Sequence, residues 1–515
     1  MGRNSNQCWW NSVPLFWALL IVSAIPLLYP AIPPLLDLPG HIGRFRVQLD
    51  IDKSPYLAQW YSFRWALFGN LGTDLLIIPV AKIFGLEMGV KLIVIAIPPL
   101  TAAGMLWLAR EIHGRIPPTA FFALPLIYCS AFQFGFVNYV LAIALMLHAL
   151  ALWLRMACKD KTRLRAVVFV PIAFVIWLCH SVAWGMFGLI IFALEFTQSI
   201  KANDGWVTAI RRAAIACLPL ALPALLMIDW WTYRSNGESA MFGLWQVKLT
   251  HIVNILRNDW RNLDLESALL LYTMVLLAVR GIGFRLDSRL GVAALLLFVV
   301  FLIMPGIVMS VDYADMRILP YAVMLAILAI TPITPSKKWQ TAIAISGLLF
   351  FAVRIAVQTW TYWHLDGQWK AQLVALDHVE RGARIFALTT AACPSSWEGT
   401  RMDHLGEMAM ARRDAFVNGH WPMPGARLLS IHYDATLGFQ YAPSQIVRPE
   451  GCPETKYYSL PKILRVLPRE AFDYLWLIDL PRNKQFNDPG MTLVWQRNRG
   501  ALYRIKHKSQ ILTAS

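Results

Sequence analysis

Long apolar runs alternate with short polar segments from the N-terminus to about residue 358. Runs of roughly 17 to 25 apolar residues can cross the ~30 Å hydrocarbon core of a bilayer as helices. The pattern therefore predicts about eleven transmembrane helices, and runs of this kind stop after residue 358. The expected spans cover residues 11–30, 88–109, 118–133, 135–154, 166–180, 182–197, 213–229, 267–280, 290–309, 318–333 and 340–358.

Composition agrees with this pattern. Of the 515 residues, 57% are hydrophobic and only 15% are charged, which lies outside the range of soluble globular domains. The formal net charge of +16 could suggest nucleic-acid binding. However, the Lys and Arg residues form no basic stripe with interleaved aromatics, and they gather in short loops between apolar runs. The charge is therefore a signal of membrane topology, and no nucleic-acid partner is expected.

The basic loops set the expected orientation. Residues 110–115, 155–165, 201–212, 280–289 and 336–338 form alternate loops that are short and basic. The positive-inside rule places such loops in the cytoplasm, together with the N-terminus. An odd number of spans then delivers the C-terminal part to the other side, which is the periplasm if the chain lies in a bacterial inner membrane.

Two domains are predicted. Residues 1–359 form a transmembrane domain with a long first periplasmic loop at residues 31–74, and residues 360–515 form a soluble periplasmic α/β domain. The second domain has an ordinary soluble composition with its own turns. Its expected elements are a helix at 369–381, strands at 384–388 and 474–478, and a hairpin formed by 491–495 and 501–505.

Cysteine placement differs between the two domains. Five cysteines lie in or beside apolar spans, where burial as small hydrophobic side chains is the simpler interpretation. Cys393 and Cys452 alone fall in the polar C-terminal part. In an oxidising compartment they could form a disulfide, and the sequence leaves this pairing open.

The first outward loop carries the most concentrated polar chemistry. It begins with Asp37-Leu38-Pro39-Gly40-His41, and Arg44 follows. A spacing of four puts Asp37 and His41 on one face if this segment is helical. There they could share a proton or bind a divalent cation such as Mg²⁺ or Mn²⁺. The alternative is a hydrated loop in which Asp37 only caps a helix.

Further polar residues are predicted at the same membrane depth and on the same side. Ionisable groups near hydrocarbon are costly, so their convergence predicts a polar cavity that opens outward. Each also has a structural alternative: a hydrogen bond between helices for His180, a helix cap for Asn138, and a mutual ion pair for Asp315 and Arg317. The set comprises His180, Asn138, Tyr139, Asp312, Asp315 and Arg317.

This arrangement resembles the membrane glycosyltransferases of the GT-C fold. Those proteins share an acidic element just after the first span, a short interfacial piece in the first loop, about eleven spans and often an outward C-terminal domain. The acidic element here is Asp37 in Asp37-Leu38, where several branches of the family have Asp-Glu. The interfacial piece corresponds to Leu75 to Phe84.

The resemblance implies an inverting transfer of a sugar from a polyprenyl-phosphate donor to a periplasmic glycan or a lipid-linked acceptor. Asp37 would be the general base, because an acceptor hydroxyl must lose a proton as it attacks, and His41 would assist it. Arg44, Arg317 and His180 would contact the donor phosphate, since guanidinium groups bind phosphate in a bidentate manner. Membrane lipids are the remaining expected partners.

Two other functions stay open from the sequence. A transporter or flippase of lipid-linked substrates would also place charged residues in a membrane cavity, although it usually shows inverted repeats and access from both sides. A non-catalytic assembly protein would use the outward domain to support a partner. Loss of sugar transfer on substitution of Asp37 would separate the enzyme from both.

Overall fold

The computed structural model describes residues 8–158, 161–232, 240–241, 245–308, 312–393, 397, 399, 401–421, 428–452, 457–480 and 488–507. The chain forms two compact units. The first contains Met1–Tyr29, Leu67–Leu76 and Leu92–Trp360; the second contains Pro30–Ala66, Ile77–Lys91 and Thr361–Ser515. The last boundary lies beside the expected one at residue 360. The sequence assigned the first long loop to the transmembrane domain, whereas most of that loop belongs to the second unit.

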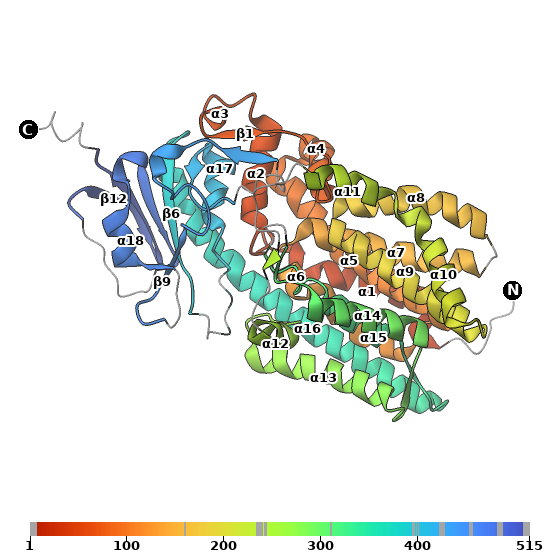
Figure 1. Cartoon of the computed structure of the whole chain (residues 1–515). Coiled ribbons are helices and arrows are strands. Elements are labelled where there is room, and N and C mark those ends of the chain that lie inside the picture. The colour runs from red at the N-terminus through yellow and green to blue at the C-terminus, as the bar shows by residue number, and fades with distance from the viewer. Residues whose placement is uncertain are drawn as a thin grey trace, which may run out of the picture. The chain divides into compact units, whose positions relative to one another are not determined.

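The first unit is helical (Figure 1). Its helices, two of which also run into the second unit, are α1 (Val13–Leu28), α5 (Leu86–His113), α6 (Ser130–Gln133), α7 (Val137–Ala157), α8 (Thr162–Cys179), α9 (Ser181–Lys201), α10 (Trp206–Cys217), α11 (Leu222–Thr232), α12 (Trp245–Val253), α13 (Arg261–Val279), α14 (Ser288–Ile303), α15 (Leu319–Leu328) and α16 (Lys337–Leu373). Helix α9 packs against α7, α8, α10 and α14. Short strand pairs join β2 (Ala240–Met241) to β4 (Ile307–Val308) and β3 (Phe284–Leu286) to β5 (Ile330–Pro332).

Six helices in the described part of the chain are long and apolar enough to cross a membrane: α5, α7, α8, α9, α13 and the run Lys337–His378 that contains α16. Three shorter apolar helices, α1, α14 and α15, accompany them. These helices and the fold make the chain a membrane protein, as the apolar runs predicted. The total of eleven spans stays a prediction.

Proline changes two of the expected spans. The run at 118–133 is a 3-10 helix, η2 (Pro118–Tyr128), followed by the short α6, and every residue of η2 is buried. The run at 213–229 is divided into α10, a 3-10 turn (Leu218–Leu220) and α11. Proline lacks a backbone N–H and clashes with the preceding helical turn, so Pro118, Pro125, Pro219 and Pro223 account for both interruptions.

The second unit contains a seven-stranded sheet in the order β10-β9-β6-β11-β13-β12, with β7 also paired to β6 (Figure 1). Strands β6 and β11 pair in parallel and are almost wholly buried, as expected for central strands. The strands are β6 (Arg384–Thr390), β7 (Phe416–Val417), β9 (Ile446–Arg448), β10 (Tyr458–Ser459), β11 (Tyr474–Ile478), β12 (Met491–Arg497) and β13 (Gly500–Ile505). The predicted strands and the hairpin between β12 and β13 are confirmed.

The first long loop is joined to the C-terminal part within this unit. Strand β1 (Tyr61–Phe63) pairs antiparallel with β8 (Leu429–Ile431). Helix α2 (Leu38–Asp50) packs on α17 (Met408–Arg413), and Arg46 Nε donates to Asp414 Oδ1 at 2.9 Å. The other helices of this unit are α3 (Leu57–Trp60) and α18 (Leu460–Val466), and α4 (Gly72–Phe84) crosses between the units.

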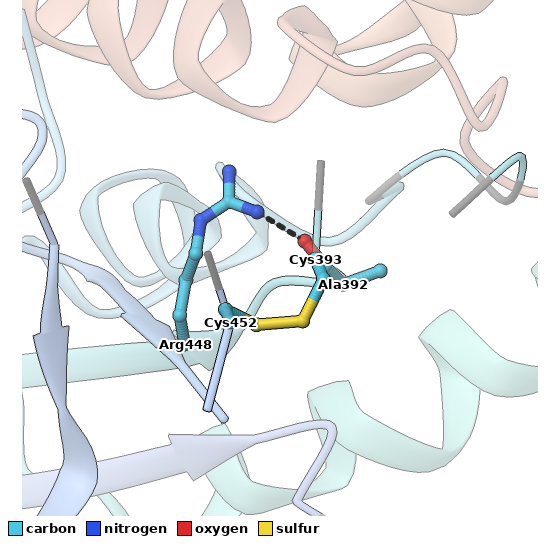
Figure 2. The surroundings of a disulfide bond; sticks show 4 residues. All are labelled: Ala392, Cys393, Arg448 and Cys452. Atoms are coloured by element: carbon cyan, nitrogen blue, oxygen red, sulfur yellow. Dashed lines mark hydrogen bonds between the residues drawn. A yellow bond between two sulfur atoms is a disulfide. The ribbon is translucent and has the colours of Figure 1, made fainter. Parts of the chain in front are cut away.

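A disulfide links Cys393 and Cys452, with a Cα–Cα distance of 5.5 Å (Figure 2). Cys393 lies just beyond β6 and Cys452 just beyond β9, so the bond joins the ends of two neighbouring parallel strands. Figure 2 also shows the Arg448 guanidinium donating to the carbonyl of Ala392 beside this bond. The pairing that the sequence left open is therefore present.

Candidate active site

Asp37 stands at the start of α2, and four residues later His41 donates its backbone N–H to the Asp37 carbonyl at 3.1 Å. The predicted helical spacing of these two residues is therefore correct. The Asp37 side chain is 19% exposed, and it accepts no capping hydrogen bond from the first turn of α2, all of which is described. Asp37 thus occupies the N-cap position of α2 without using its carboxylate to cap the helix.

An imidazole from the C-terminal part faces the Asp37 carboxylate. His404 Nε2 lies 3.9 Å from Asp37 Oδ1, and His404 Nδ1 lies 3.3 Å from Glu407 Oε1. His404 immediately precedes the 3-10 turn η5 (Leu405–Glu407), which packs on α2. The result is a carboxylate–imidazole–carboxylate series. Neither His404 nor Glu407 was predicted from the sequence.

Burial and charge set the protonation of this series. Burial raises the pKa of Glu407, whose side chain is 1% exposed and whose Oε2 has no hydrogen-bond partner among the described residues. Burial alone would lower the pKa of His404, but the hydrogen bond to Glu407 and the charges of Glu407, Asp37 and Asp403 raise it above its ordinary value. A positively charged His404 next to Asp37 favours the ionised form of that carboxylate.

Aromatic packing encloses the same residues. The Trp421 ring lies 4.2 Å from the His404 ring and 6.1 Å from the His41 ring, and it stacks on His420 at 5.1 Å. A Cβ atom on Gly40 would stand 2.3 Å from Cη2 of Trp421, so a side chain at position 40 would displace the indole. The close approach of Trp421 therefore favours glycine at position 40 of Asp37-Leu38-Pro39-Gly40-His41.

Arg44 completes the residues that α2 contributes. It follows His41 by three positions and Asp37 by seven, a spacing that places all three toward one face of a helix. The residue is 6% exposed, and its guanidinium lies 4.9 Å from the centre of the Phe45 ring. Helix α2 therefore carries a carboxylate, an imidazole and a guanidinium, and His404 and Glu407 lie on the side of the Asp37 carboxylate.

The first unit holds a second polar cluster, around Arg317. Arg317 Nη1 lies 3.1 Å from His180 Nε2, Nη2 donates to the carbonyl of Asp312 at 3.3 Å, and the guanidinium stacks 3.8 Å from the centre of the Phe136 ring. The hydroxyl of Tyr139 donates to the carbonyl of Arg317 at 2.7 Å. His180, Tyr139, Asp312 and Arg317, which the sequence placed together, are thus gathered in one network.

Asp315 and Asn138, in the first unit, do not make the contacts that their structural alternatives predicted from the sequence. Asp315 does not pair with Arg317; its Oδ2 accepts from the buried Lys248 Nζ at 2.8 Å, and His251 Nε2 lies 3.8 Å from its Oδ1. Asn138 does not cap α7. Its Oδ1 accepts from both the backbone N–H and the hydroxyl of Thr73, at 2.5 and 2.6 Å.

Comparison with known proteins identifies the architecture. No family model matches the sequence, and no curated protein does. Among solved structures, ArnT from Cupriavidus metallidurans in the apo state matches over 96% of this chain and 97% of its own, with 14% identity and a TM-score of 0.50. The chain has the ArnT fold. A structure of the same protein bound to undecaprenyl phosphate matches with 12% identity, 96% and 98% coverage and a TM-score of 0.49.

The ArnT likeness confirms the GT-C fold that the sequence resembles. The predicted site residues are divided between the two units: Asp37, His41 and Arg44 belong to the second, and His180, Asn138, Tyr139, Asp312, Asp315 and Arg317 belong to the first. Within the described residues, no three or more His, Cys, Asp or Glu side chains are arranged to hold a metal ion. A divalent cation held by Asp37 and His41 stays a prediction.

Proposed function

We propose that this protein is a membrane glycosyltransferase that moves a sugar from a polyprenyl-phosphate donor to a hydroxyl of a periplasmic or lipid-linked acceptor. The GT-C fold shared with ArnT supports the general class. The observation that carries the assignment of Asp37 is its partly exposed carboxylate, held at the start of α2 with His404 Nε2 3.9 Å away. An ionised carboxylate in such a position can take the proton that an acceptor hydroxyl loses as it attacks.

The reaction is a single displacement. The acceptor oxygen forms a bond to the anomeric carbon, and Asp37 takes its proton. At the same time the bond from the anomeric carbon to the phosphate oxygen breaks, and the electron pair leaves with the lipid phosphate. Attack from the face opposite the leaving group inverts the anomeric configuration, so product stereochemistry is a direct test of this mechanism.

His404 and Glu407 act on the base and not on the sugar. A protonated His404 favours the carboxylate form of Asp37, which must be ionised before each turnover. The contact of Glu407 Oε1 with His404 Nδ1 fixes the orientation of the ring, so that Nε2 faces Asp37. We therefore assign His404 as a positioning residue whose removal weakens the base without removing it.

The lipid phosphate gathers negative charge as it leaves, and cationic side chains stabilise it. Arg44 and Arg317 are the guanidinium groups assigned to this role, with His180 beside Arg317 at 3.1 Å. Bidentate contacts from guanidinium to phosphate are favoured by geometry. If Asp37 and His41 also hold a divalent cation, chelation by EDTA will abolish transfer and added Mg²⁺ or Mn²⁺ will restore it.

The proposed location is the bacterial inner membrane, with a cytoplasmic N-terminus and the C-terminal domain in the periplasm. The disulfide between Cys393 and Cys452 supports this side, because disulfides persist in oxidising compartments. A reporter enzyme that is active only in the periplasm, fused after residue 515, will be active. An inactive C-terminal fusion together with an active N-terminal fusion would show the opposite topology.

The function is tested in cells by mass spectrometry of envelope glycans and glycolipids from a strain that lacks the gene. We expect one glycan species to lose a sugar, the wild-type gene to restore it, and Asp37→Asn to fail. Asp52→Asn is the matched control, because Asp52 is an exposed aspartate on the same loop. Envelope glycans that are unchanged in the deletion strain would contradict the proposal.

A further inference from the structure

A cavity of about 490 Å³ lies in the first unit, and none of its lining residues belongs to either polar cluster. Residues of α1, α5 and α7 line it, and two of them, Arg110 and Arg155, come from the last turns of α5 and α7. Both arginines are exposed, so the cavity reaches the surface of the unit. It lies at the end of the helices where the short basic loops begin.

The lining is divided into a charged and an apolar part. Arg110 and Arg155 supply two positive charges, and the remaining wall includes the apolar side chains of Phe16, Leu106 and Ile116. The single carboxylate, Glu111, accepts a hydrogen bond from the Trp107 indole at 2.8 Å, so part of its accepting capacity is used within the wall. The cavity therefore carries a net positive charge.

We propose that this cavity binds the headgroup and upper acyl chain of an anionic phospholipid. The two guanidinium groups match a phosphodiester, to which guanidinium binds in a bidentate manner. The apolar wall matches the adjoining acyl chain, and the volume lies within the usual range for small-molecule sites. Basic pockets between transmembrane helices on the cytoplasmic side are suited to anionic headgroups.

This site is independent of the proposed sugar transfer. It shares no lining residue with the Asp37 group or with the Arg317 network, and its occupant is a membrane component and not a donor or acceptor. A bound lipid here would hold α1, α5 and α7 together at one end of the unit. Binding can therefore be measured whether or not the protein transfers sugar.

Cys158 gives a direct reporter, because it lines the cavity and is exposed. The sequence predicted burial of the five unbonded cysteines, but Cys158 is exposed and Cys8 and Cys217 are only half-buried. Replacing the half-buried Cys8 and Cys217 with serine leaves Cys158 as the accessible thiol, since Cys129 and Cys179 are buried. The rate of maleimide labelling at Cys158 then reports occupancy of the cavity.

The experiment compares the full-length protein in nanodiscs of phosphatidylcholine alone and with phosphatidylglycerol. We expect phosphatidylglycerol to slow labelling about threefold or more, and Arg110→Gln/Arg155→Gln to remove this protection, since each cationic residue contributes substantially to binding an anionic lipid. The matched control is Arg163→Gln/Arg280→Gln, which removes two exposed arginines that do not line the cavity and keeps the protection.

Three results would overturn the proposal. Equal labelling rates in the two membranes would show that no anionic lipid covers Cys158. Equal protection in the Arg110/Arg155 and control variants would show a general effect of surface charge. Protection by soluble glycerol phosphate in phosphatidylcholine nanodiscs would identify a site for free anions instead of a lipid site.

Discussion

Removing the disulfide between Cys393 and Cys452 should destabilise the second unit selectively. The two cysteines are 59 residues apart in sequence, and the bond restricts the unfolded chain by closing this loop. The chain-entropy relation for a loop of this length gives about 4 kcal/mol at 25 °C. The variant Cys393→Ala/Cys452→Ala should lose up to this amount from the free energy of opening the sheet.

Hydrogen exchange followed by mass spectrometry measures this loss in the full-length protein. Strands β6 and β9 lie directly before the two cysteines and pair with each other, so their amides report the opening that the bond opposes. About 4 kcal/mol corresponds to an increase of about a thousandfold in the population of the open state. Helix α7, in the other unit, serves as the internal reference and should exchange at the wild-type rate.

The control variant is Cys8→Ala/Cys217→Ala, which removes two half-buried cysteines that form no disulfide. Its exchange in β6 and β9 should match the wild type. A change below about tenfold in β6 and β9 of the disulfide variant would refute the loop-closure reasoning, because a tenfold change corresponds to only about 1.4 kcal/mol, far below the roughly 4 kcal/mol expected from closing a loop of this length. An equal acceleration in α7 would show a loss of stability that is not confined to the second unit.

Three other substitutions test the site and its surroundings. Neighbouring carboxylates raise the pKa of His404 despite its burial, so the stability that its positive charge contributes is fully present below about pH 6.5 and is lost as pH rises through the raised pKa. The difference in melting temperature between wild type and His404→Gln should therefore shrink as pH rises from 6 to 9. A difference that stays constant over this range would contradict the prediction. Gly40→Ala places a methyl group against Trp421 and should cost about 1 to 3 kcal/mol, whereas Gly185→Ala, in open space, should leave the unfolding midpoint no lower. Lys248→Met leaves a buried aspartate without its cation and should cost about 3 to 5 kcal/mol, so a melting temperature equal to that of the wild type would show that the pair is not needed.

Local patterns were sufficient for much of the fold. Apolar periodicity and length located the long helices α5, α7, α8 and α9, and short apolar runs between turns located β6, β11 and the final hairpin. The errors arose at prolines. The run at 118–133 is apolar because protein buries it on all sides, and hydropathy cannot distinguish such burial from contact with lipid.

The part of the candidate site on α2 could be predicted from the sequence because its residues are neighbours on one helix. Asp37, His41 and Arg44 lie within eight positions, so their common face follows from helical spacing. His404 and Glu407 were missed because they reach Asp37 through the packing of η5 and α17 on α2, a contact between distant parts of the chain. The spacing of three between His404 and Glu407, next to Asp403, is the signal that was available.

Long-range partners also decided which ion pairs form. Asp315 and Arg317 are two positions apart, and a loop salt bridge between them was one interpretation. The structure instead pairs Asp315 with Lys248 from α12, because the buried ammonium also satisfies the carbonyls of Phe301 and Met304 at 2.8 and 2.7 Å. Such shared hydrogen bonding cannot be deduced from the sequence. The charged residue nearest to Asp315 in sequence, Arg317, was therefore the wrong partner to predict.

The central claim is that Asp37 is the general base of a sugar transfer, and an assay with purified protein tests it most directly. Wild type, Asp37→Asn and Asp52→Asn are reconstituted with lipid extract from the source membrane, and transfer to the acceptor glycan or lipid is followed by mass spectrometry. Loss of a general base lowers the rate by about 10² to 10⁴, so we expect Asp37→Asn to be reduced by this factor while its melting temperature and the activity of Asp52→Asn stay at wild-type values. Transfer by folded Asp37→Asn at the wild-type rate would contradict the account.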